Sequence, residues 1–413
     1  MKHDPTDGMI EGRDIICFAN DWDSDPLSKK HIMLQLAKRN RVLWVNSIGT
    51  RNPQVSARDF RRSFRKLQKS LAGYKRQADN LFLYSPLAVP FHGNSVAQMF
   101  NRQWLPWCLR RILRQLDFRN PITWTFLPTS ADVVGSLGEG FILYHCVDEF
   151  SEFTGTNKTA LLEMERRLSQ RANLVIVSSD RLYENKQHLN PNTFLVRHGV
   201  DVEHFRNACS PTTVVPNDVV TLRPPVIGFH GLIADWVDIE LIRFLASARP
   251  QWSFALIGKL EMNAEPLRRL TNVHLLGTKE YALLPACCKG FDVAILPFVI
   301  NELTLAANPL KLREYLAAGL PVVSTAIPEA ARLGNLLRLG VSCEHFLQQI
   351  EALLAEGNRG PSIAISKSMD SESWDERVMD MCRLISSVNP KIVKKGIRPP
   401  IAPGFTESLS ENA

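Results

Sequence analysis

The sequence predicts an α/β protein that consists of two doubly wound domains. Short apolar and β-branched runs alternate with helical patterns along the chain, and one polar, proline-bearing stretch, Asp201 to Pro225, interrupts this alternation. Such alternation is typical of parallel sheets covered by helices, and 413 residues are enough for two domains. Open α/β sheets bind ligands beyond the carboxyl ends of their strands, so we expect the chemistry in a cleft between the two domains.

The expected strands form two groups, one on each side of that interruption. The first group comprises 14–19, 41–46, 81–85, 122–126, 141–147, 173–178 and 193–196, and the second comprises 226–229, 252–257, 273–276, 291–297 and 320–324. The polar and proline-rich end of the chain predicts a disordered tail. The resulting expectation is an N-terminal extension at 1–12, a first domain at 13–205, a linker at 206–224, a second domain at 225–370 and a tail at 389–413.

Composition places the chain among ordinary folded proteins. Apolar residues make up 45% and charged residues 22%, close to the average for soluble globular domains. The N-terminus has no apolar core of a secretory signal, and the longest apolar runs, such as 291–300, are too short to cross a bilayer. Eight cysteines without a C-x-x-C pair exclude a zinc or disulfide framework. We therefore expect a cytoplasmic protein with reduced, mostly buried thiols.

Most of the positive charge lies in one segment. Between Arg51 and Arg76 there are nine basic residues and one acid, whereas the whole chain has a net charge of +7. Within 58–71 the apolar residues recur at helical spacing, which predicts an amphipathic basic helix that binds an anionic membrane at the inner face of the cell. A solvated surface helix is the alternative. Aromatic residues spaced for base stacking are absent from this segment, so we do not expect nucleic-acid binding.

The most informative motif is the string NPLKLREYLAAG. Asn308 suits a helix N-cap, Pro309 the first helical position and Gly319 the residue after the helix. Lys311 and Glu314 then lie three residues apart on one face. A helix N-terminus with a lysine suits a diphosphate, and a glutamate one turn further can accept both ribose hydroxyls. The alternative is an ordinary capped helix with a Lys–Glu surface pair.

This string resembles the nucleotide-sugar-binding motif of GT-B fold glycosyltransferases of the family 4 (group 1) type, Pro-x-Lys-x-x-Glu-Tyr-x-Ala-x-Gly-x-Pro-Val. The resemblance covers most of the chain. It is also carried by His198-Gly-Val-Asp201 with Phe205, by Asn272-Val-His-Leu-Leu-Gly277 with Leu284-Pro285, and by Ser373-Trp374.

The resemblance implies a GT-B fold with two Rossmann-like domains, an interdomain cleft and a terminal helix at 371–388 that crosses back to the first domain. It implies a metal-independent, retaining glycosyltransferase that uses a nucleotide-diphosphate sugar as substrate and has no cofactor. The expected acceptor is a lipid-linked glycan or a growing surface polysaccharide, as in exopolysaccharide biosynthesis.

One position departs from the family pattern. Family 4 enzymes commonly carry two glutamates eight positions apart, and the earlier position, 306, is alanine here. Asn308, Thr304 or Glu302 are the residues that can take over contact with the donor sugar. The missing acid also supports a second hypothesis, a catalytically silent sugar-nucleotide-binding scaffold of a polysaccharide assembly complex.

In the first domain, Asp148 follows an apolar strand and is expected at the rim of the cleft. There a carboxylate can deprotonate an acceptor hydroxyl or stabilise positive charge on the donor sugar; the alternative is that Asp148 caps the next helix. His145, within the strand, is a second catalytic candidate, although a core histidine is the favoured interpretation. Asp21 and Trp22 are candidate acceptor contacts, and Ser28 is expected to cap a helix at 29–39.

In the second domain, the loop after the first strand contains His230 and Gly231, where the family usually places a basic contact to the donor phosphates. Lys259, after the second strand, is a further candidate for that contact. P-loop, metalloprotease, hydrolase and dinucleotide motifs do not occur in the sequence. We expect no metal site.

Overall fold

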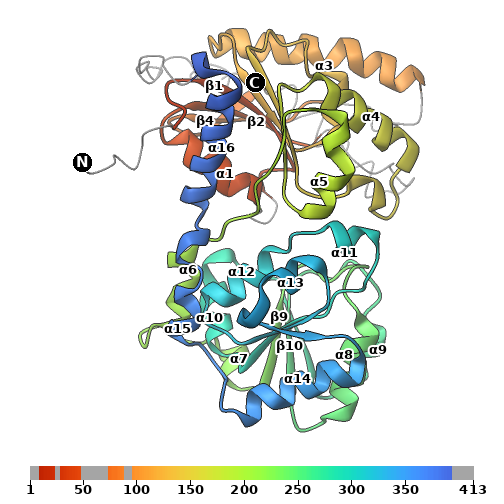
Figure 1. Ribbon diagram of the computed structural model, residues 1–413, viewed down its shortest axis with the longest axis vertical. Coiled ribbons are helices and arrows are strands. Elements are labelled where there is room, and N and C mark those ends of the chain that lie inside the picture. Colours follow the sequence, from red (N-terminus) through yellow and green to blue (C-terminus); the bar gives the residue numbers. More distant parts are fainter. Residues whose placement is uncertain (1–8, 24–27, 48–72, 88–94, 393–413) are drawn as a thin grey trace, which may run out of the picture.

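The computed structural model describes residues 9–23, 28–47, 73–87 and 95–392, and these form two α/β domains. Figure 1 shows the domains one above the other, with the last long helix, α16 (Trp374–Val388), lying against the first domain. The predicted basic helix at 58–71 lies outside the described residues. No helix of the described chain is long and apolar enough to cross a membrane.

The N-terminal domain contains an eight-stranded sheet in the order β3-β4-β2-β1-β5-β6-β7-β8, in which only β3 is antiparallel to its neighbour. The strands are β1 (Asp14–Phe18), β2 (Arg41–Val45), β3 (Tyr74–Ala78), β4 (Leu81–Tyr84), β5 (Ile122–Thr125), β6 (Phe141–Cys146), β7 (Leu174–Val177) and β8 (Thr193–Leu195). The helices that cover it are α1 (Ser28–Ala37), α3 (Ser95–Gln115), α4 (Lys158–Arg171) and α5 (Asp180–Lys186).

The two faces of this sheet are buried by different helices. Ile15 packs into a cluster with residues of α1 and α16, whereas the next residue, Ile16, packs into a cluster with residues of α3 and α4. This is the alternation expected for a strand covered on both sides. It explains why the parallel strands read as continuous apolar runs in the sequence.

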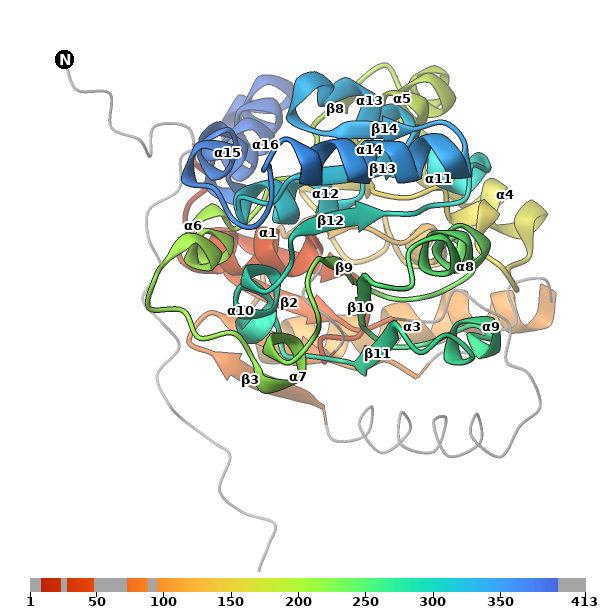
Figure 2. The ribbon, with the colours of Figure 1, turned by 90° about the horizontal axis from the view of Figure 1, so that it is seen from below.

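The C-terminal domain contains a six-stranded parallel sheet in the order β11-β10-β9-β12-β13-β14. Helices lie on both sides of it, with α10 and α12 on one side and α8, α9 and α14 on the other (Figure 2). The strands are β9 (Val226–His230), β10 (Ser253–Ile257), β11 (Val273–Gly277), β12 (Val293–Leu296), β13 (Val322–Thr325) and β14 (Arg338–Gly340). The helices are α6 (Val202–Arg206), α7 (Asn217–Val220), α8 (Ile239–Ala248), α9 (Glu265–Arg268), α10 (Leu284–Lys289), α11 (Glu302–Ala306), α12 (Leu310–Ala317), α13 (Pro328–Arg332), α14 (Cys343–Ala355) and α15 (Ile363–Lys367).

Every strand expected from the sequence is present, and two further strands, β3 and β14, were not expected. Strand β3 has the sequence YKRQA, and four of its five residues are exposed, so it carries no apolar signal. Strand β14 has only three residues. Both lie at sheet edges, where hydrogen bonding to one neighbour is enough to hold a strand that its own side chains do not specify.

Two segments that connect the domains run side by side. The N–H of Val200 donates a hydrogen bond to the carbonyl of Glu372 at 2.8 Å, and Val200 pairs with Ser373 as a parallel bridge. A Cβ atom on Gly199 would lie 2.9 Å from the amide nitrogen of Trp374, so this approach requires glycine. The crossing from the first domain to the second and the return by α16 therefore meet at one place.

Three segment boundaries differ from the expectation. The expected extension ends in the core, because Ile10 is fully buried. The expected linker packs onto the second domain, since Ala208 and Val219 are buried in its core; Phe205, expected to end the first domain, is buried there too. The expected tail begins later than 389, because residues 390–392 form a short turn that accepts a hydrogen bond from Arg13 at 2.8 Å; residues from 393 on lie outside the described chain. In each case a few apolar or polar contacts outweigh a polar local composition.

Candidate functional site

Helix α12 does not begin as the motif predicted. Its N-cap is Pro309, without a side-chain cap, and Asn308 makes other contacts. The amide nitrogen of Asn308 donates to the carbonyl of Ser178 in the first domain at 2.6 Å, and its oxygen accepts from Arg313 at 2.6 Å. The predicted cap is wrong because the guanidinium of Arg313, which is fully buried, needs an acceptor. Asn308 therefore ties α12 to the other domain.

Tyr315 fixes α12 against the end of β9. Its hydroxyl accepts a hydrogen bond from the N–H of His230 at 2.8 Å and lies 3.3 Å from the carbonyl of the same residue. This contact brings Glu314 next to His230, with 3.9 Å between Oε2 and Nε2. The imidazole of His230 is stacked on Phe205, a residue of the segment that leads out of the first domain. The Glu-Tyr pair of the motif thus places the carboxylate and anchors the helix.

Lys311 lies over the backbone of Gly231. A Cβ atom on Gly231 would come 2.8 Å from Cε of Lys311, and Gly231 has φ +143°, a conformation that side chains rarely allow. Gly258 approaches from the next loop, where a Cβ would lie 1.8 Å from the carbonyl oxygen of Gly231. The backbone just after β9 therefore carries no side chain at Gly231, where Lys311 covers it. A bare backbone beside a lysine suits an anion.

The charges of this cluster follow from burial. Burial raises the pKa of Glu314, and the charge of Lys311 opposes that rise. Burial lowers the pKa of His230 to about 3, and Lys311 lowers it further. At neutral pH the imidazole of His230 is therefore uncharged.

Asp148 belongs to the first domain, and charged residues of both domains change its pKa. It follows β6 and is partly buried. Burial raises its pKa to about 6, while the charges of Lys29 and Lys311 lower it and Glu149 raises it. A charge of the second domain, that of Lys311, thus acts on this carboxyl group together with charges of the first domain. The alternative capping role is not observed, because the next helical turn has Glu149 at its N-cap position.

Lys29 is the site residue that the sequence analysis missed. It is 3% exposed, its ammonium group donates to Oδ1 of Asn20 at 2.7 Å, and it lies 5.6 Å from the ring centre of Phe150. Burial lowers its pKa and Asp148 opposes that shift. The signal was present in the sequence, because Lys29 shares the i, i+3, i+4, i+7 spacing of the buried residues Ile32, Met33 and Leu36. Because lysine is almost never fully buried without a partner, a lysine on the apolar face of a helix indicates a partner in the folded protein.

His145 has the geometry of a core histidine. It is fully buried, with its ring 4.9 Å from that of Phe126, and neither ring nitrogen has a hydrogen-bond partner. Burial and the nearby charge of Lys29 lower its pKa to about 3. A neutral, enclosed imidazole of this kind agrees with the core histidine that the sequence favoured.

The remaining candidates of the first domain are held by local contacts. Asp21 accepts a hydrogen bond from the N–H of Ser47 at 3.1 Å. Trp22 is 8% exposed and packs edge-on against Trp44. Ser28 is the buried first residue of α1. The acceptor contact predicted for Trp22 is left without support, because its ring belongs to the core.

Position 306 lies at the domain boundary. Ala306 is 1% exposed, and its carbonyl accepts a hydrogen bond from the hydroxyl of Ser179 at 2.6 Å. Thr304 caps α11 through a reciprocal pair of hydrogen bonds with Asn301, and Glu302 pairs with Arg181 at 3.2 Å. With Asn308 bound to Ser178, each predicted substitute for the missing glutamate is engaged in contacts within or between the domains.

Lys259 lies in the loop that follows β10. It is exposed and pairs with Glu261 at 2.6 Å. Within the part of the chain that the structure describes, no group of three or more His, Cys, Asp or Glu residues could hold a metal ion. All eight cysteines are free.

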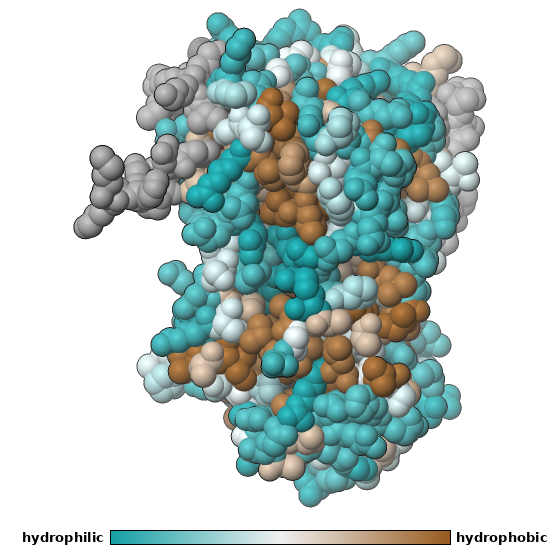
Figure 3. Space-filling model, in the orientation of Figure 1, coloured by the Kyte–Doolittle hydropathy of each residue, from teal (hydrophilic) through white to brown (hydrophobic). Residues whose placement is uncertain are grey.

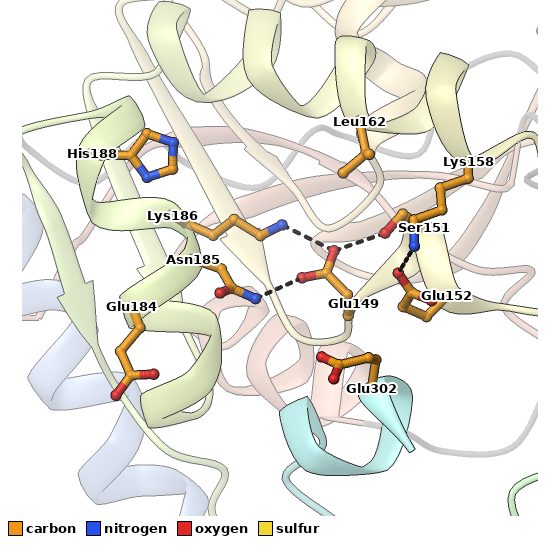
Figure 4. A pocket seen from close by; sticks show the side chains of 10 residues that line it. All are labelled: Glu149, Ser151, Glu152, Lys158, Leu162, Glu184, Asn185, Lys186, His188 and Glu302. Atoms are coloured by element: carbon orange, nitrogen blue, oxygen red, sulfur yellow. Dashed lines mark hydrogen bonds and ion pairs between the residues drawn. The ribbon is translucent and has the colours of Figure 1, made fainter.

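A polar pocket of about 380 Å³ is lined in part by Glu149, the residue that follows Asp148 (Figure 4). Its central residue is Glu149, which accepts hydrogen bonds from Lys186 at 2.9 Å and Ser151 at 3.1 Å. Glu302 of α11 contributes to the wall from the second domain. Glu149 pairs with Lys186 and Glu152 with Lys158, and Glu184 and Glu302 both pair with Arg181, so the pocket is lined by an ion-pair network. The lining residues are Glu149, Ser151, Glu152, Lys158, Leu162, Glu184, Asn185, Lys186, His188 and Glu302.

The sequence of the second domain matches a known family. Residues 224–356 match the model of the glycosyl transferases group 1. These residues form a group 1 glycosyltransferase domain. The family predicted from the motif is thereby confirmed, and Lys311 and Glu314 lie within the matched range of that group 1 domain.

A curated relative extends the likeness. TuaH of Bacillus subtilis (strain 168), named for glycosyl transfer in teichuronic acid biosynthesis, is 28% identical over 209 residues, which are 46% of this chain. The match spans about half, 52%, of the length of that relative.

Solved structures show that the group 1 domain is part of a GT-B fold. Sucrose-phosphate synthase from Thermosynechococcus elongatus aligns with a TM-score of 0.66 at 14% identity over 92% of this chain and 100% of its own. A trehalose-phosphate synthase from Burkholderia xenovorans, solved with glucose-6-phosphate, aligns with a TM-score of 0.62 at 12% identity over 91% and 100%. Anabaena HepE in complex with UDP-glucose aligns with 0.55 at 15% identity over 92% and 98%. The predicted GT-B fold is confirmed.

Proposed function

We propose that the protein is a glycosyltransferase that moves a sugar from a nucleoside-diphosphate sugar to a hydroxyl group of a surface polysaccharide or a lipid-linked glycan. One observation carries the proposal. Lys311 lies over the bare backbone of Gly231, and its charge lowers the pKa of both Glu314 and Asp148, the latter in the opposite domain. The relative named for teichuronic acid biosynthesis and the UDP-sugar complex of HepE support the substrate classes.

Each group then has one task. Lys311, over the bare backbone of Gly231, neutralises the diphosphate, and Glu314 accepts hydrogen bonds from the ribose hydroxyls. In the transfer, the acceptor oxygen forms a bond to the anomeric carbon, and the bond from that carbon to the diphosphate oxygen breaks. The electron pair leaves with the diphosphate. The acceptor proton goes to Asp148, whose raised pKa suits a general base near neutral pH.

Metal independence remains part of the proposal, and so does a retaining outcome, which requires the acceptor oxygen to approach the anomeric carbon on the same face that the diphosphate leaves. A lysine and a bare strand end supply the charge that a leaving diphosphate requires, which supports transfer without a metal. Attachment to the inner face of the membrane through 58–71 also stays a prediction.

The second hypothesis, a silent sugar-nucleotide-binding scaffold, is favoured by one observation. The position of the first family glutamate is Ala306, buried at the domain boundary. Both hypotheses predict that the protein binds the donor, and only the first predicts turnover.

Two measurements test the proposal. Saturation-transfer NMR with UDP-, GDP- and ADP-sugars should show binding of one nucleotide class, and this binding should weaken in Lys311→Ala. Incubation with that donor should then release free nucleoside diphosphate, slowly with water and faster with an acceptor. Donor binding without any release of nucleotide would favour the scaffold, and binding that survives in Lys311→Ala would move the donor site elsewhere.

A further inference from the structure

Helix α3 exposes an unusual row of aromatic side chains. Met99 is 61% exposed, Phe100 47% and Trp107 52%. Phe100 stacks on Trp104 at 5.9 Å, and Trp104 stacks on Trp107 at 5.3 Å between ring centres. Single exposed apolar residues are normal on a protein surface, but a contiguous row of rings marks an interaction site. Nothing in the proposed transfer reaction uses this row.

The same face of α3 continues as a row of arginines. Residues spaced from the rings by helical turns are Arg110, Arg111 and Arg114, and all three are exposed. Helix α3 contains no acidic residue along its 21 positions. Among the ion pairs of the described chain, none involves these three arginines; Arg110 only donates to the carbonyl of Ser136. The α3 face, defined as Met99, Phe100, Trp104, Trp107, Arg110, Arg111 and Arg114, is therefore apolar at one end and cationic at the other.

The opposite face of α3 fixes the helix to the domain. Leu105, Leu109, Ile112 and Leu113 are buried in a cluster with strands β1, β2 and β4. Figure 1 shows α3 at the outer edge of the N-terminal domain, on the side away from the C-terminal domain. The rings are thus presented on a rigid support, and the α3 face is separate from the donor cluster.

We propose that the α3 face docks the protein onto an anionic lipid surface. Tryptophan, phenylalanine and methionine insert at the boundary between headgroups and acyl chains, and arginines beside them attract anionic headgroups. The absence of acids on α3 and the three unpaired arginines favour lipid phosphates over a second copy of this chain. This inference goes beyond the proposed function, because it concerns binding without donor or acceptor and does not depend on segment 58–71.

Vesicle binding of the full chain tests this inference. The probe is cosedimentation with vesicles of phosphatidylcholine, with and without phosphatidylglycerol, at low and high salt. The expected result is binding to the anionic vesicles that falls about fivefold for each charge removed in Arg111→Gln and Arg114→Gln. Phe100→Ser combined with Trp107→Ser should weaken binding by about tenfold or more. Leu283→Ser and Arg243→Gln, exposed residues of the C-terminal domain, are matched controls that should not change it.

A second measurement locates the contact. In Trp104→Phe with Trp107→Phe the apolar surface is kept, so binding should persist, while quenching of tryptophan fluorescence by brominated lipids should drop. Unchanged partitioning of the serine and glutamine variants would overturn the inference. So would loss of binding only in a variant with Arg61, Arg62, Arg65 and Lys66 replaced by Gln. A dimer in solution that dissociates on Trp107→Ser would show instead that the α3 face contacts a second copy.

Discussion

The two sides of the cleft are built in different ways. On the C-terminal side, Lys311, Glu314 and Tyr315 lie within five residues of one helix, so their spacing in the sequence already fixes their arrangement in space. On the N-terminal side, Lys29 and Asp148 belong to segments more than a hundred residues apart and meet only because β1 and β6 end at the same edge of the sheet. A local motif reveals the proposed donor side, whereas the proposed acceptor side emerges only from the fold.

The largest expected effect concerns the acceptor side. Asp148→Asn should lower turnover by about 10²–10⁴, with donor affinity nearly unchanged, because a general base acts mainly in the transition state. The pKa of Asp148 in the folded protein, about 6, lies above the ordinary 3.8. Between pH 3.8 and pH 6 the folded protein therefore binds more protons at Asp148 than the unfolded chain does, so the free energy of unfolding falls as the pH rises through this range. At pH 7 the melting temperature of the variant should therefore equal or exceed that of the wild-type protein.

Turnover and melting temperature of that variant, measured together, sharpen the comparison. Asp79→Asn, an exposed residue of the same domain, is the control. Normal turnover would remove Asp148 from the mechanism, and a drop in melting temperature would contradict the burial argument.

The next effect concerns the donor side. Lys311→Ala should weaken binding of both the free nucleoside diphosphate and the intact donor by about 10- to 100-fold, as expected for loss of a charge-assisted contact. Glu314→Gln should weaken nucleosides with a ribose and leave inorganic pyrophosphate unaffected. Calorimetry with each ligand checks both results, with the exposed Lys367→Ala as control. Equal losses of pyrophosphate in the two variants would show that Glu314 does not contact the ribose.

A smaller effect concerns the contact of Asn308 between the two domains. Asn308→Ala removes the hydrogen bond to Ser178 and leaves the buried guanidinium of Arg313 without one acceptor. The free energy of unfolding should fall by about 1–3 kcal/mol, the cost of an unsatisfied buried polar group. Urea unfolding measures it, and Asn358→Ala at an exposed position is the comparison. A change below about 0.5 kcal/mol would mean that water replaces the lost contact.

The smallest effect concerns Lys29. Its charge lowers the pKa of Asp148, so in Lys29→Met that pKa should rise and the acidic limb of the pH dependence of kcat should move to higher pH. Lys29→Arg keeps the charge and should restore most of the wild-type profile. A uniform loss of kcat without displacement of the profile would indicate packing rather than electrostatics.

The sequence predicted every core strand because burial on both faces produces a continuous apolar run. It did not predict β3 and β14, whose residues carry no such signal. The motif located Lys311 and Glu314 but misplaced Asn308, because nothing local shows that Arg313 is buried and needs an acceptor. On the acceptor side, Asp148 could be found from the strand before it. Lys29 could be found from its place on the apolar face of α1, but its relation to Asp148 requires the folded protein.

The return of α16 to the first domain has a consequence for synthesis of the protein. Trp374, Val378, Met381 and Ile385 complete a core whose other residues, apart from Leu310 and further residues of α16, come from the first half of the chain. When residues 1–205 have left the ribosome, that core still exposes the surface which α16 later covers, whereas the second domain has all its strands once residue 340 has emerged. Domains commonly fold in the order of synthesis. Here the domain that is made first is finished last.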